Sequence, residues 1–483
     1  MNNKKTIKSL KKNALLSILY RLMRTIFPLI TFPYASRILM PEGIGRVNFA
    51  NAIVSYFVLL ASLGIGVYAT REGAKYRDNI FKFSKFVKEI FLINCLSTTI
   101  SYLLFFIIIF NIQKLKGYTS LLLLSGTTIF FTSLGLNWVY SALEEFTYAT
   151  VRSIIFLFAS IAFLFIFVKT KNDYLQYMGM TVLASVGANI CNIIHSRKFV
   201  KWKEPCTLEL KKHIKPIFIF FGIEVASNVH TLIDTSMLGF MSDDTQVGFY
   251  SAATKCSKIV SNMILAAISI LLPRLSYYYE NGELKKFLSL SKRAFQFITY
   301  VSVPSVAGLF LLSKPLILVL SGNQYLPAVL PMEIISPVVL FVSLSNLMSS
   351  QILTPMGKEK FVLLAVIAGS IINASLNMFF IPSYGASGAA IATVISEFLI
   401  VIVNFYFSRK IIFSNFSIDF IIQIVLSTFF MFCIVYKIQM EIKSPIKQLL
   451  ICSFIGAIIY ALSTILMKNK IAIELFDIIR GKK

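Results

Sequence analysis

Long apolar runs alternate with short polar connections over the whole length of the chain. The runs over residues 86–110 and 446–467 are typical, because each exceeds twenty residues and holds very few charges. An α-helix of about 20 apolar residues crosses a hydrocarbon core about 30 Å thick. Lipid offers the backbone no hydrogen-bond partners, so repeated runs of this length must be helices. The pattern therefore predicts an all-α protein that crosses a membrane many times.

We expect about fourteen transmembrane helices, with connections too short to hold a separate soluble domain. The longest connection lies near residues 195–213. The expected helices occupy residues 13–39, 44–70, 86–110, 119–143, 148–168, 174–194, 214–240, 247–272, 291–313, 325–350, 361–381, 385–407, 416–436 and 446–467.

Composition supports this class and narrows the chemistry. Hydrophobic residues make up 57% of the 483 positions and charged residues 14%, with a mean hydropathy of +0.76. Soluble domains are about 45–50% apolar and about 25% charged. The six cysteines have no paired spacing, so we expect neither a disulfide framework nor a metal site, and we expect no bound cofactor. The apolar run after MNNKKTIKSLKK is too long for a signal peptide, which makes it the first permanent helix.

The formal net charge of +25 follows mostly from membrane topology. If the N-terminus is cytoplasmic, the cytoplasmic segments hold 31 Lys and Arg residues and the outer loops hold 8. Cytoplasmic loops of membrane proteins carry such an excess of positive charge. The distribution predicts cytoplasmic N- and C-termini and attraction to anionic membrane lipids. It leaves no reason to expect nucleic acid as a partner.

A weak internal repeat predicts the domain organisation. Aligning Gly45 with Gly248 places IGRVNFANAI over VGFYSAATKC, and each segment follows a short polar turn, MPEG or MSDD. A repeat of six helices conserves orientation and relates two bundles by an axis along the membrane normal. We therefore expect a six-helix bundle over residues 1–200, a second over residues 201–412, and two additional helices with a cytoplasmic tail over residues 413–483.

Two arginines lie inside the first predicted helix. Arg24 is about 11 residues, or about 16 Å, into it, and Arg21 shares its face because residues three apart are neighbours on a helix. A charged side chain facing lipid at the membrane centre costs at least about 2.5–3.5 kcal/mol. We expect both to face a partner or a water-filled cavity. Arg152 lies near a helix end, where a long side chain reaches the interface, and we expect it there.

Three further helices carry polar stripes at helical spacing. The second predicted helix holds Asn48, Asn51 and Ser55, and the eighth holds Lys255, Lys258 and Asn262. In the seventh, Glu224 and Asn228 belong to a stripe that reaches Asp234. The repeat aligns Arg21 with Glu224, so polar faces recur at matching positions of both halves. The stripes predict a central cavity between two bundles.

The charge balance of this cavity favours an anionic substrate. Ion pairs such as Arg21–Glu224 or Lys258–Asp234 are the alternative, with a purely structural role. However, four cations (Arg21, Arg24, Lys255 and Lys258) face only two acids on these helices. Uncompensated buried charge is costly, and arginine binds phosphate through two parallel hydrogen bonds. We therefore expect a phosphate-bearing substrate, with Glu224, Asp234 and Glu397 as candidates for coupling to H⁺ or Na⁺.

Two stretches resemble a known family. FPLITFPYASRILMPEGIGRVNFANAIVSYFVLLASLGIGVYATREGAK (27–75) and IPSYGASGAAIATVISE (381–397) are similar to segments of bacterial polysaccharide flippases, in the superfamily of multidrug, oligosaccharidyl-lipid and polysaccharide exporters. The resemblance implies two six-helix bundles arranged as in multidrug and toxic-compound extruders. It also implies alternating access for undecaprenyl-pyrophosphate-linked O-antigen or capsule repeat units, and a cationic cavity with arginine in the first helix, to which Arg21 and Arg24 correspond. The resemblance further implies a place in the inner (plasma) membrane of a bacterium, with polysaccharide polymerase and chain-length machinery as partners.

Other functions stay open beside this one. A lipid II flippase also moves a pyrophosphate lipid, and the sequence does not identify the glycan. A multidrug exporter of the same fold would bind cationic drugs and need an acid-rich cavity. A membrane-embedded polymerase would need a large outer loop or clustered catalytic residues, which the short connections disfavour. Transport, with no bond made or broken, is the expected activity.

Overall fold

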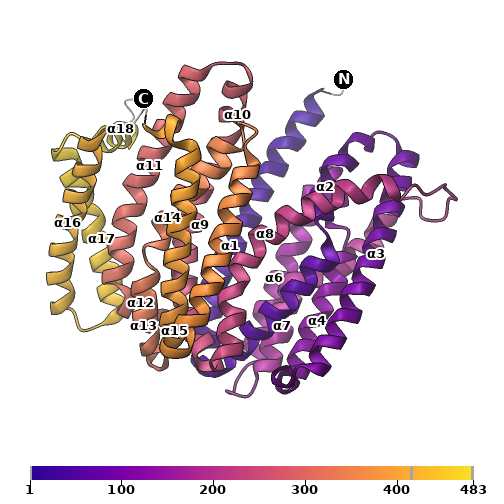
Figure 1. Ribbon diagram of the computed structural model, residues 1–483, viewed down its shortest axis with the longest axis horizontal. Helices are drawn as coiled ribbons and strands as arrows, with labels where there is room; N and C mark the ends of the chain where they lie inside the picture. The colour runs from indigo at the N-terminus through magenta and orange to yellow at the C-terminus, as the bar shows by residue number, and fades with distance from the viewer. Residues whose placement is uncertain (1–2, 414–416, 480–483) are drawn as a thin grey trace. The chain divides into compact units, whose positions relative to one another are not determined.

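The computed structural model describes residues 3–413 and 417–479. Side chains are described from residue 26 onward and at Met23, except at positions 223, 226, 227, 413, 475, 478 and 479. Every element in the described part of the chain is a helix, which confirms the all-α prediction (Figure 1). The chain divides into two compact units, Met1–Phe240 and Met241–Lys483.

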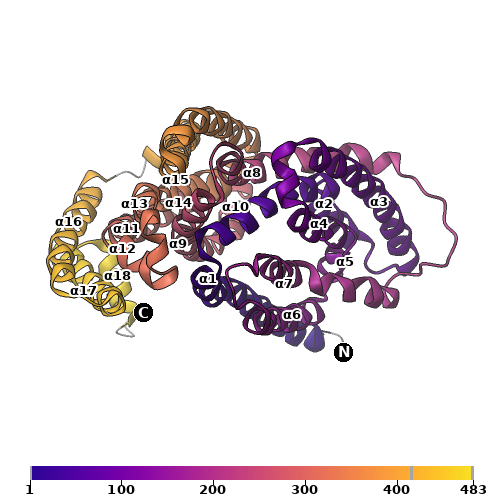
Figure 2. The same ribbon diagram turned by 90° about the horizontal axis from the view of Figure 1, so that it is seen from below.

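The first unit contains α1 to α8. Inside it α1 packs against α3, α4 and α6, while α7 packs against α4 and α6. Figure 2 shows several of these helices nearly end-on. The elements are α1 (Asn3–Ser62), α2 (Ile65–Gly73), η1 (Ala74–Tyr76), α3 (Ile80–Asn111), η2 (Gln113–Tyr118), α4 (Thr119–Ser133), α5 (Asn137–Ala142), α6 (Phe146–Phe167), α7 (Tyr174–His195), η3 (Ser196–Lys198) and α8 (Lys211–Met241).

The second unit contains the remaining elements. Here α9 packs against α13 and α14, α11 packs against α14 and α16, and α16 pairs with α17. The elements are α9 (Asp244–Ser269), α10 (Leu272–Glu280), α11 (Leu284–Leu311), α12 (Ser313–Leu320), η4 (Asn323–Ala328), α13 (Val329–Ile335), α14 (Val338–Asn346), η5 (Leu347–Leu353), α15 (Glu359–Phe413), α16 (Ile418–Glu441), α17 (Pro445–Leu466) and α18 (Lys470–Ile479).

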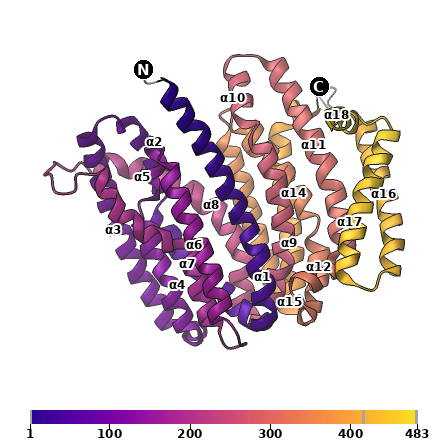
Figure 3. The same cartoon turned by 180° about the vertical axis from the view of Figure 1, so that it is seen from behind.

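The two longest helices each contain a break where the sequence predicts a turn. α1 has 60 residues and α15 has 55, so at 1.5 Å per residue each exceeds the membrane core severalfold. Met40 departs from helical backbone with φ 60° and ψ 174°, because Pro41 disfavours a helical conformation in the preceding residue. Gly385 departs with φ 53° and ψ −126°, a conformation that favours glycine. Figure 3 shows the chain turning back within α1.

Ten helices in the described part of the chain are long and apolar enough to cross a membrane, or eleven if a bent pair counts as one span. That pair, Asn323–Ile335 and Val338–Leu353, meets at 44° around Pro337. The protein is thus a multi-pass membrane protein. Two of the ten, Ile26–Tyr76 and Glu359–Ile412, contain the breaks at Met40 and Gly385. The exact number of fourteen stays a prediction.

The unit boundary places α8 with the first unit, although we expected this helix to open the second bundle. Close backbone contacts explain its position. A Cβ atom on Gly64 would lie 2.5 Å from the Phe221 nitrogen, and one on Gly239 would lie 2.0 Å from Phe49 Cδ2. Two glycines therefore let α8 approach α1 and the α1–α2 break. The predicted division into residues 1–200, 201–412 and 413–483 stays a prediction.

Candidate functional site

The two arginines that are predicted to face a cavity belong to α1. The side chains of Arg21 and Arg24 lie outside the described residues, so their expected cavity-facing position stays a prediction.

The polar stripe after the Met40 break lies on an accessible face of α1. Asn48, Asn51 and Ser55 are all half-buried, and Ser55 Oγ donates a hydrogen bond to the Asn51 carbonyl oxygen at 2.7 Å. The positions between them, such as Val47 and Ala50, are completely buried. The apolar face of this helix is therefore packed inside the unit, whereas its polar face is only half-buried.

The polar stripe of α8 is also accessible. Asn228 and Glu224 lie one turn apart, Asn228 is exposed, and its Nδ2 donates to the Glu224 carbonyl oxygen at 2.9 Å. Asp234 differs, because only 5% of it is exposed. Nearby, the Tyr56 and Ser236 hydroxyls lie 2.9 Å apart. This contact brings the α1 helix that carries Ser55 next to the α8 segment that carries Asp234.

The predicted cations of the second unit share one face of α9. Lys258 and Asn262 are exposed and Lys255 is half-buried. The opposite face of α9 packs into the unit through residues such as Ala253 and Cys256, which are at most 4% exposed. Residues three apart are neighbours on a helix, so this face of α9 carries two amines side by side.

Glu397, a predicted coupling candidate, lies in the second half of α15 and is half-buried. The fully buried polar residues are its neighbours. Asn373 Nδ2 donates to Ser396 Oγ at 3.4 Å, and Asn377 Nδ2 donates to Asn373 Oδ1 at 3.1 Å. This amide network joins the two halves of α15, and no spacing rule in the sequence singled it out.

Arg152 does not reach the interface as expected. It is only 7% exposed, and its guanidinium carbon lies 5.8 Å from the Tyr140 ring centre and 5.5 Å from that of Tyr148. The His195 ring stacks on Tyr148 with centres 3.7 Å apart. Aromatic faces attract a guanidinium, so this cation is stabilised inside the first unit and belongs to its packing.

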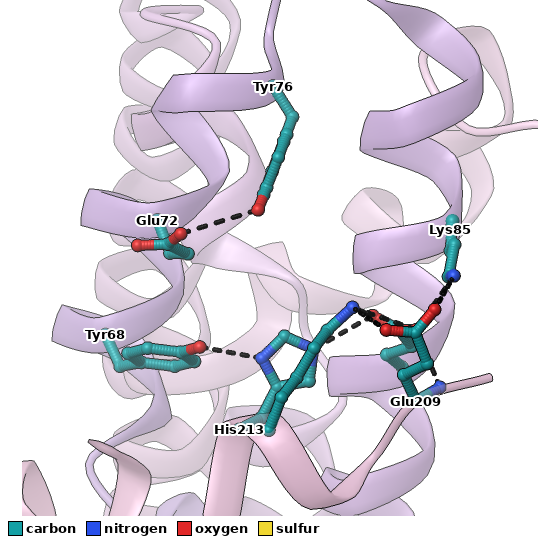
Figure 4. A network of polar contacts seen from close by, with 8 residues as sticks. Tyr68, Glu72, Tyr76, Lys85, Glu209 and His213 are labelled. Carbon is teal, nitrogen blue, oxygen red and sulfur yellow. Dashed lines mark hydrogen bonds and ion pairs between the residues drawn. The ribbon is translucent and has the colours of Figure 1, made fainter.

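A buried polar network that no sequence pattern predicted lies at one end of the first unit (Figure 4). Glu89 of α3 is 1% exposed, and its carboxylate accepts the Glu209 backbone N–H at 2.8 Å. His213 Nε2 lies 2.9 Å from the same carboxylate, and the Tyr68 hydroxyl lies 2.7 Å from His213 Nδ1. A carboxylate only accepts, so Nε2 carries a proton, and in the neutral ring Nδ1 accepts from Tyr68.

Lysines extend this network to the connection that leads into α8. Lys212 Nζ lies 3.2 Å from Glu89 Oε2, and Lys85 Nζ lies 2.6 Å from Glu209 Oε1. The hydrogen bonds from Lys85 and Lys212 hold the pKa of the exposed Glu209 carboxyl below its usual range. Lys201 N also donates to Ser84 Oγ at 2.9 Å. Ion pairs and hydrogen bonds thus hold the connection between α7 and α8, the longest of the chain, against α3. The signal for it was a single acid, Glu89, near the start of a predicted span.

No group of three or more His, Cys, Asp or Glu side chains among the described residues could hold a metal ion. The polar faces carry amides, hydroxyls and amines together with the Glu224 carboxylate, all of which are groups that can form hydrogen bonds.

Comparisons with known proteins agree with this architecture. A curated Shigella dysenteriae protein, provisionally named an O-antigen transporter, is 26% identical over 400 residues, which cover 81% of this chain and 98% of that protein. An Escherichia coli K12 protein of the same name is 24% identical over 416 residues, covering 83% and 97%. A solved structure of the lipid II flippase MurJ in an inward closed conformation superposes with a TM-score of 0.77 at 17% identity, covering 93% and 98%.

A second solved structure, a multidrug resistance MATE family transporter in an inward-facing conformation, superposes on this chain with a TM-score of 0.65 at 13% identity. The superposition covers 82% of this chain and 97% of the transporter. These likenesses confirm a MATE-like helical fold. The polysaccharide biosynthesis protein family model matches residues 10–278, more than half of the sequence. The chain therefore belongs to the polysaccharide biosynthesis protein family.

Proposed function

We propose that this protein is a flippase that moves a lipid-linked oligosaccharide across its membrane, without making or breaking a bond. The observation that carries the proposal is the similarity, over nearly their full length, to two proteins provisionally named O-antigen transporters. The accessible polar faces support it. Amide and hydroxyl side chains such as Asn51 and Asn228 suit hydrogen bonding to a glycan, and the Lys255–Lys258 face suits a phosphate.

The finer proposal concerns the substrate and its route. An undecaprenyl-pyrophosphate carrier presents its phosphates to Arg21 and Arg24, with Lys255 and Lys258 meeting them during alternating access. Asn48, Asn51, Ser55, Asn228 and Asn262 contact the sugar, and the prenyl tail stays in lipid. Movement of H⁺ or Na⁺ through Glu224, Asp234 or Glu397 supplies the driving force.

Substitution of Arg24 tests the phosphate contact. In liposomes containing a fluorescent prenyl-pyrophosphate oligosaccharide, an external glycan-modifying enzyme reports how much sugar crosses. We expect Arg24→Ala to abolish most transport, and Arg24→Lys to restore it only in part, because lysine lacks the bidentate fork of arginine. Arg37→Ala is the control, since Arg37 is exposed and its Nη1 donates to its own helix at the Pro33 carbonyl oxygen, 2.8 Å away. Normal transport by both Arg24 variants refutes the assignment.

Lipid II is the second substrate to test in the same assay. A Bacillus subtilis lipid II flippase is 22% identical over 277 residues, which cover 54% of this chain and 47% of that protein. Transport of lipid II at the rate of the oligosaccharide carrier would show that the glycan is not selected. Transport of neither lipid by folded protein, under imposed pH and Na⁺ gradients, would reject the flippase proposal and favour an exporter of other small molecules.

A further inference from the structure

The last described helix, α18, is too short to cross a membrane. Its ten residues extend about 15 Å at 1.5 Å per residue, which is half of a hydrocarbon core about 30 Å thick. It follows the membrane-spanning helix α17 after a turn of three residues, 467–469. Figure 1 shows it at the end of the second unit where α17 ends. A short helix in this place lies at the level where the membrane meets water.

One buried side chain builds the turn before α18. Asn469 is completely buried, and its Oδ1 accepts the Ile471 backbone N–H at 3.1 Å. Its Nδ2 donates to Gln423 Oε1 of α16 at 2.9 Å. An asparagine in this position begins a helix, because it satisfies a backbone donor of the first turn. The start of α18 is therefore fixed relative to α16 and α17.

One face of α18 packs on the second unit. Ile471 and Ala472 are 7% and 3% exposed and belong to the same apolar cluster as Ile424 of α16 and Tyr460 of α17. On a neighbouring face, Glu474 Oε1 lies 3.9 Å from Arg293 Nη2 of α11. The helix is thus seated on the bundle by its buried apolar face.

A second apolar strip of α18 is accessible. Ile473 is 39% exposed and Phe476 is 36% exposed, and residues three apart are neighbours on a helix. At 3.6 residues per turn, this strip lies between the buried face and a charged strip formed by Lys470, Glu474 and Asp477. Apolar and charged strips side by side are typical of helices that lie in the plane of a membrane interface.

The surroundings of this strip are suited to a bilayer surface. Leu462 and Leu466, near the end of α17, are 55% and 82% exposed, and a spanning helix presents such side chains to hydrocarbon. Lys468 and Lys470 are exposed next to them. Over residues 468–483 the sequence holds five Lys and Arg residues and two acids. Anionic lipids of the cytoplasmic leaflet attract basic segments of this kind.

We infer that α18 is an interfacial membrane-binding helix. It inserts Ile473 and Phe476 among the acyl chains and places Lys468 and Lys470 at the phosphates of anionic bilayer phospholipids. The bilayer is the partner because the surface begins where a spanning helix ends and its basic residues complement anionic headgroups. The inference does not depend on the transported substrate, since no residue of α18 belongs to the proposed phosphate and glycan contacts.

Tryptophan quenching in liposomes measures the depth of α18. The full chain is reconstituted in phosphatidylcholine whose acyl chains carry bromine, which quenches tryptophan fluorescence on contact. The signal of the native Trp138 and Trp202 is recorded in the unsubstituted chain and subtracted. We expect Ile473→Trp and Phe476→Trp to be quenched nearly as strongly as Leu462→Trp, which reports on the lipid-facing surface of α17.

Two further positions serve as controls for the depth. Lys470→Trp lies on the charged strip of α18, and Asn281→Trp lies in the exposed turn between α10 and α11, so we expect weak quenching of both. Phe476→Trp exchanges one aromatic ring for another, and it decides the result if Ile473→Trp does not fold. Quenching of the apolar strip no stronger than that of Asn281→Trp overturns the inference and favours a protein partner for this strip.

Mixed liposomes test the lysines in the Phe476→Trp chain. At the same low mole fraction, brominated phosphatidylglycerol should quench several-fold more than brominated phosphatidylcholine, because the lysines concentrate anionic lipid at α18. Joint substitution of Lys468→Gln and Lys470→Gln should remove most of this excess. Lys443→Gln, in the exposed turn before α17, should leave it unchanged. Equal quenching by the two lipids, or an excess that the joint substitution does not lower, refutes the contact with anionic headgroups.

Discussion

At the scale of single residues, the buried Glu89 carboxylate shows how a charge is tolerated inside the first unit. It is almost inaccessible, and its oxygens meet the Glu209 backbone N–H, His213 and Lys212 at 2.8, 2.9 and 3.2 Å. Burying a charge is tolerated only when partners satisfy it. These three partners come from the connection before α8 or from the first turn of α8, so the Glu89 side chain holds this segment against α3.

We therefore expect Glu89→Ala to destabilise the protein by about 3–5 kcal/mol, because removing one member of a buried ionic network leaves the others uncompensated. Lys75→Ala is the matched control. It breaks the Lys75–Glu72 pair, whose lysine is 62% exposed, and exposed pairs contribute about 0–1 kcal/mol. Thermal unfolding in detergent, followed by loss of monodisperse protein, measures both. Equal melting temperatures for the two variants would contradict a structural role for Glu89.

The sequence predicted where charged residues lie along the helices, but not which side chains they contact. It drew attention to Arg152 as a cation near a helix end, but the rings of Tyr140 and Tyr148 come from elsewhere in the chain and were not foreseeable. Glu89, Tyr68 and His213 are separated by up to 145 residues, and no local pattern links them. In contrast, stripes such as Asn48, Asn51 and Ser55 depend only on helical periodicity, so their shared face was predictable.

At the scale of elements, the helix breaks follow from local chemistry. Met40 precedes a proline, and Gly385 has a backbone that glycine adopts. At the second break, Gln246 Oε1 accepts the Ala386 backbone N–H at 2.9 Å, which satisfies a donor freed by the turn. Both breaks lie near predicted boundaries, at 39/44 and 381/385. The α1–α2 break at Gly64 was not predicted, because residues 44–70 form one apolar run and were expected to form a single helix.

The Gly64 break gives a test of how α8 is attached. Gly64 has φ 68°, and a Cβ atom there would lie 2.5 Å from the Phe221 nitrogen. We expect Gly64→Ala to lower stability by more than the about 1–2 kcal/mol of left-handed backbone strain, because the α8 backbone must also move. Gly66→Ala is the control, since no atom lies within 4 Å of a Cβ atom at that position. Hydrogen exchange should show faster exchange in residues 217–225 only for Gly64→Ala. Unchanged exchange in that segment would mean that α8 does not depend on this contact.

At the scale of the whole molecule, the fold class was predictable because lipid leaves the backbone so few choices. The lengths of the apolar runs predicted the long helices, whereas short helices such as α10 and α18 had no predicted counterpart. The arrangement of helices within each unit depended on contacts that sequence periodicity does not encode, such as those of Gly239 with Phe49. The predicted division into six-helix bundles, with α8 opening the second, stays a prediction beside the two compact units, the first of which ends at Phe240.

The orientation of the chain in the membrane is the last prediction, and it depends on all the connections together. The excess of Lys and Arg in alternate connections predicts that the segment before α8 is cytoplasmic and that the connection between α6 and α7 is outside. Cys206 is exposed in the first of these segments, and Asn172 is exposed in the second. A chain that keeps Cys206 as its sole cysteine, and a second whose sole cysteine comes from Asn172→Cys, report on the two sides.

With a membrane-impermeant maleimide, we expect Asn172→Cys to react in intact spheroplasts and Cys206 to react only after permeabilisation. Each chain serves as the control for the other, because both cysteines lie in exposed connections and differ only in the side on which they are predicted to lie. The reverse pattern would place the termini outside, and the binding faces would then open toward the wrong side for a lipid made in the cytoplasm. Reaction of both cysteines in intact spheroplasts would place both connections on the same side of the membrane. This result would contradict the single span that is predicted between residues 172 and 206.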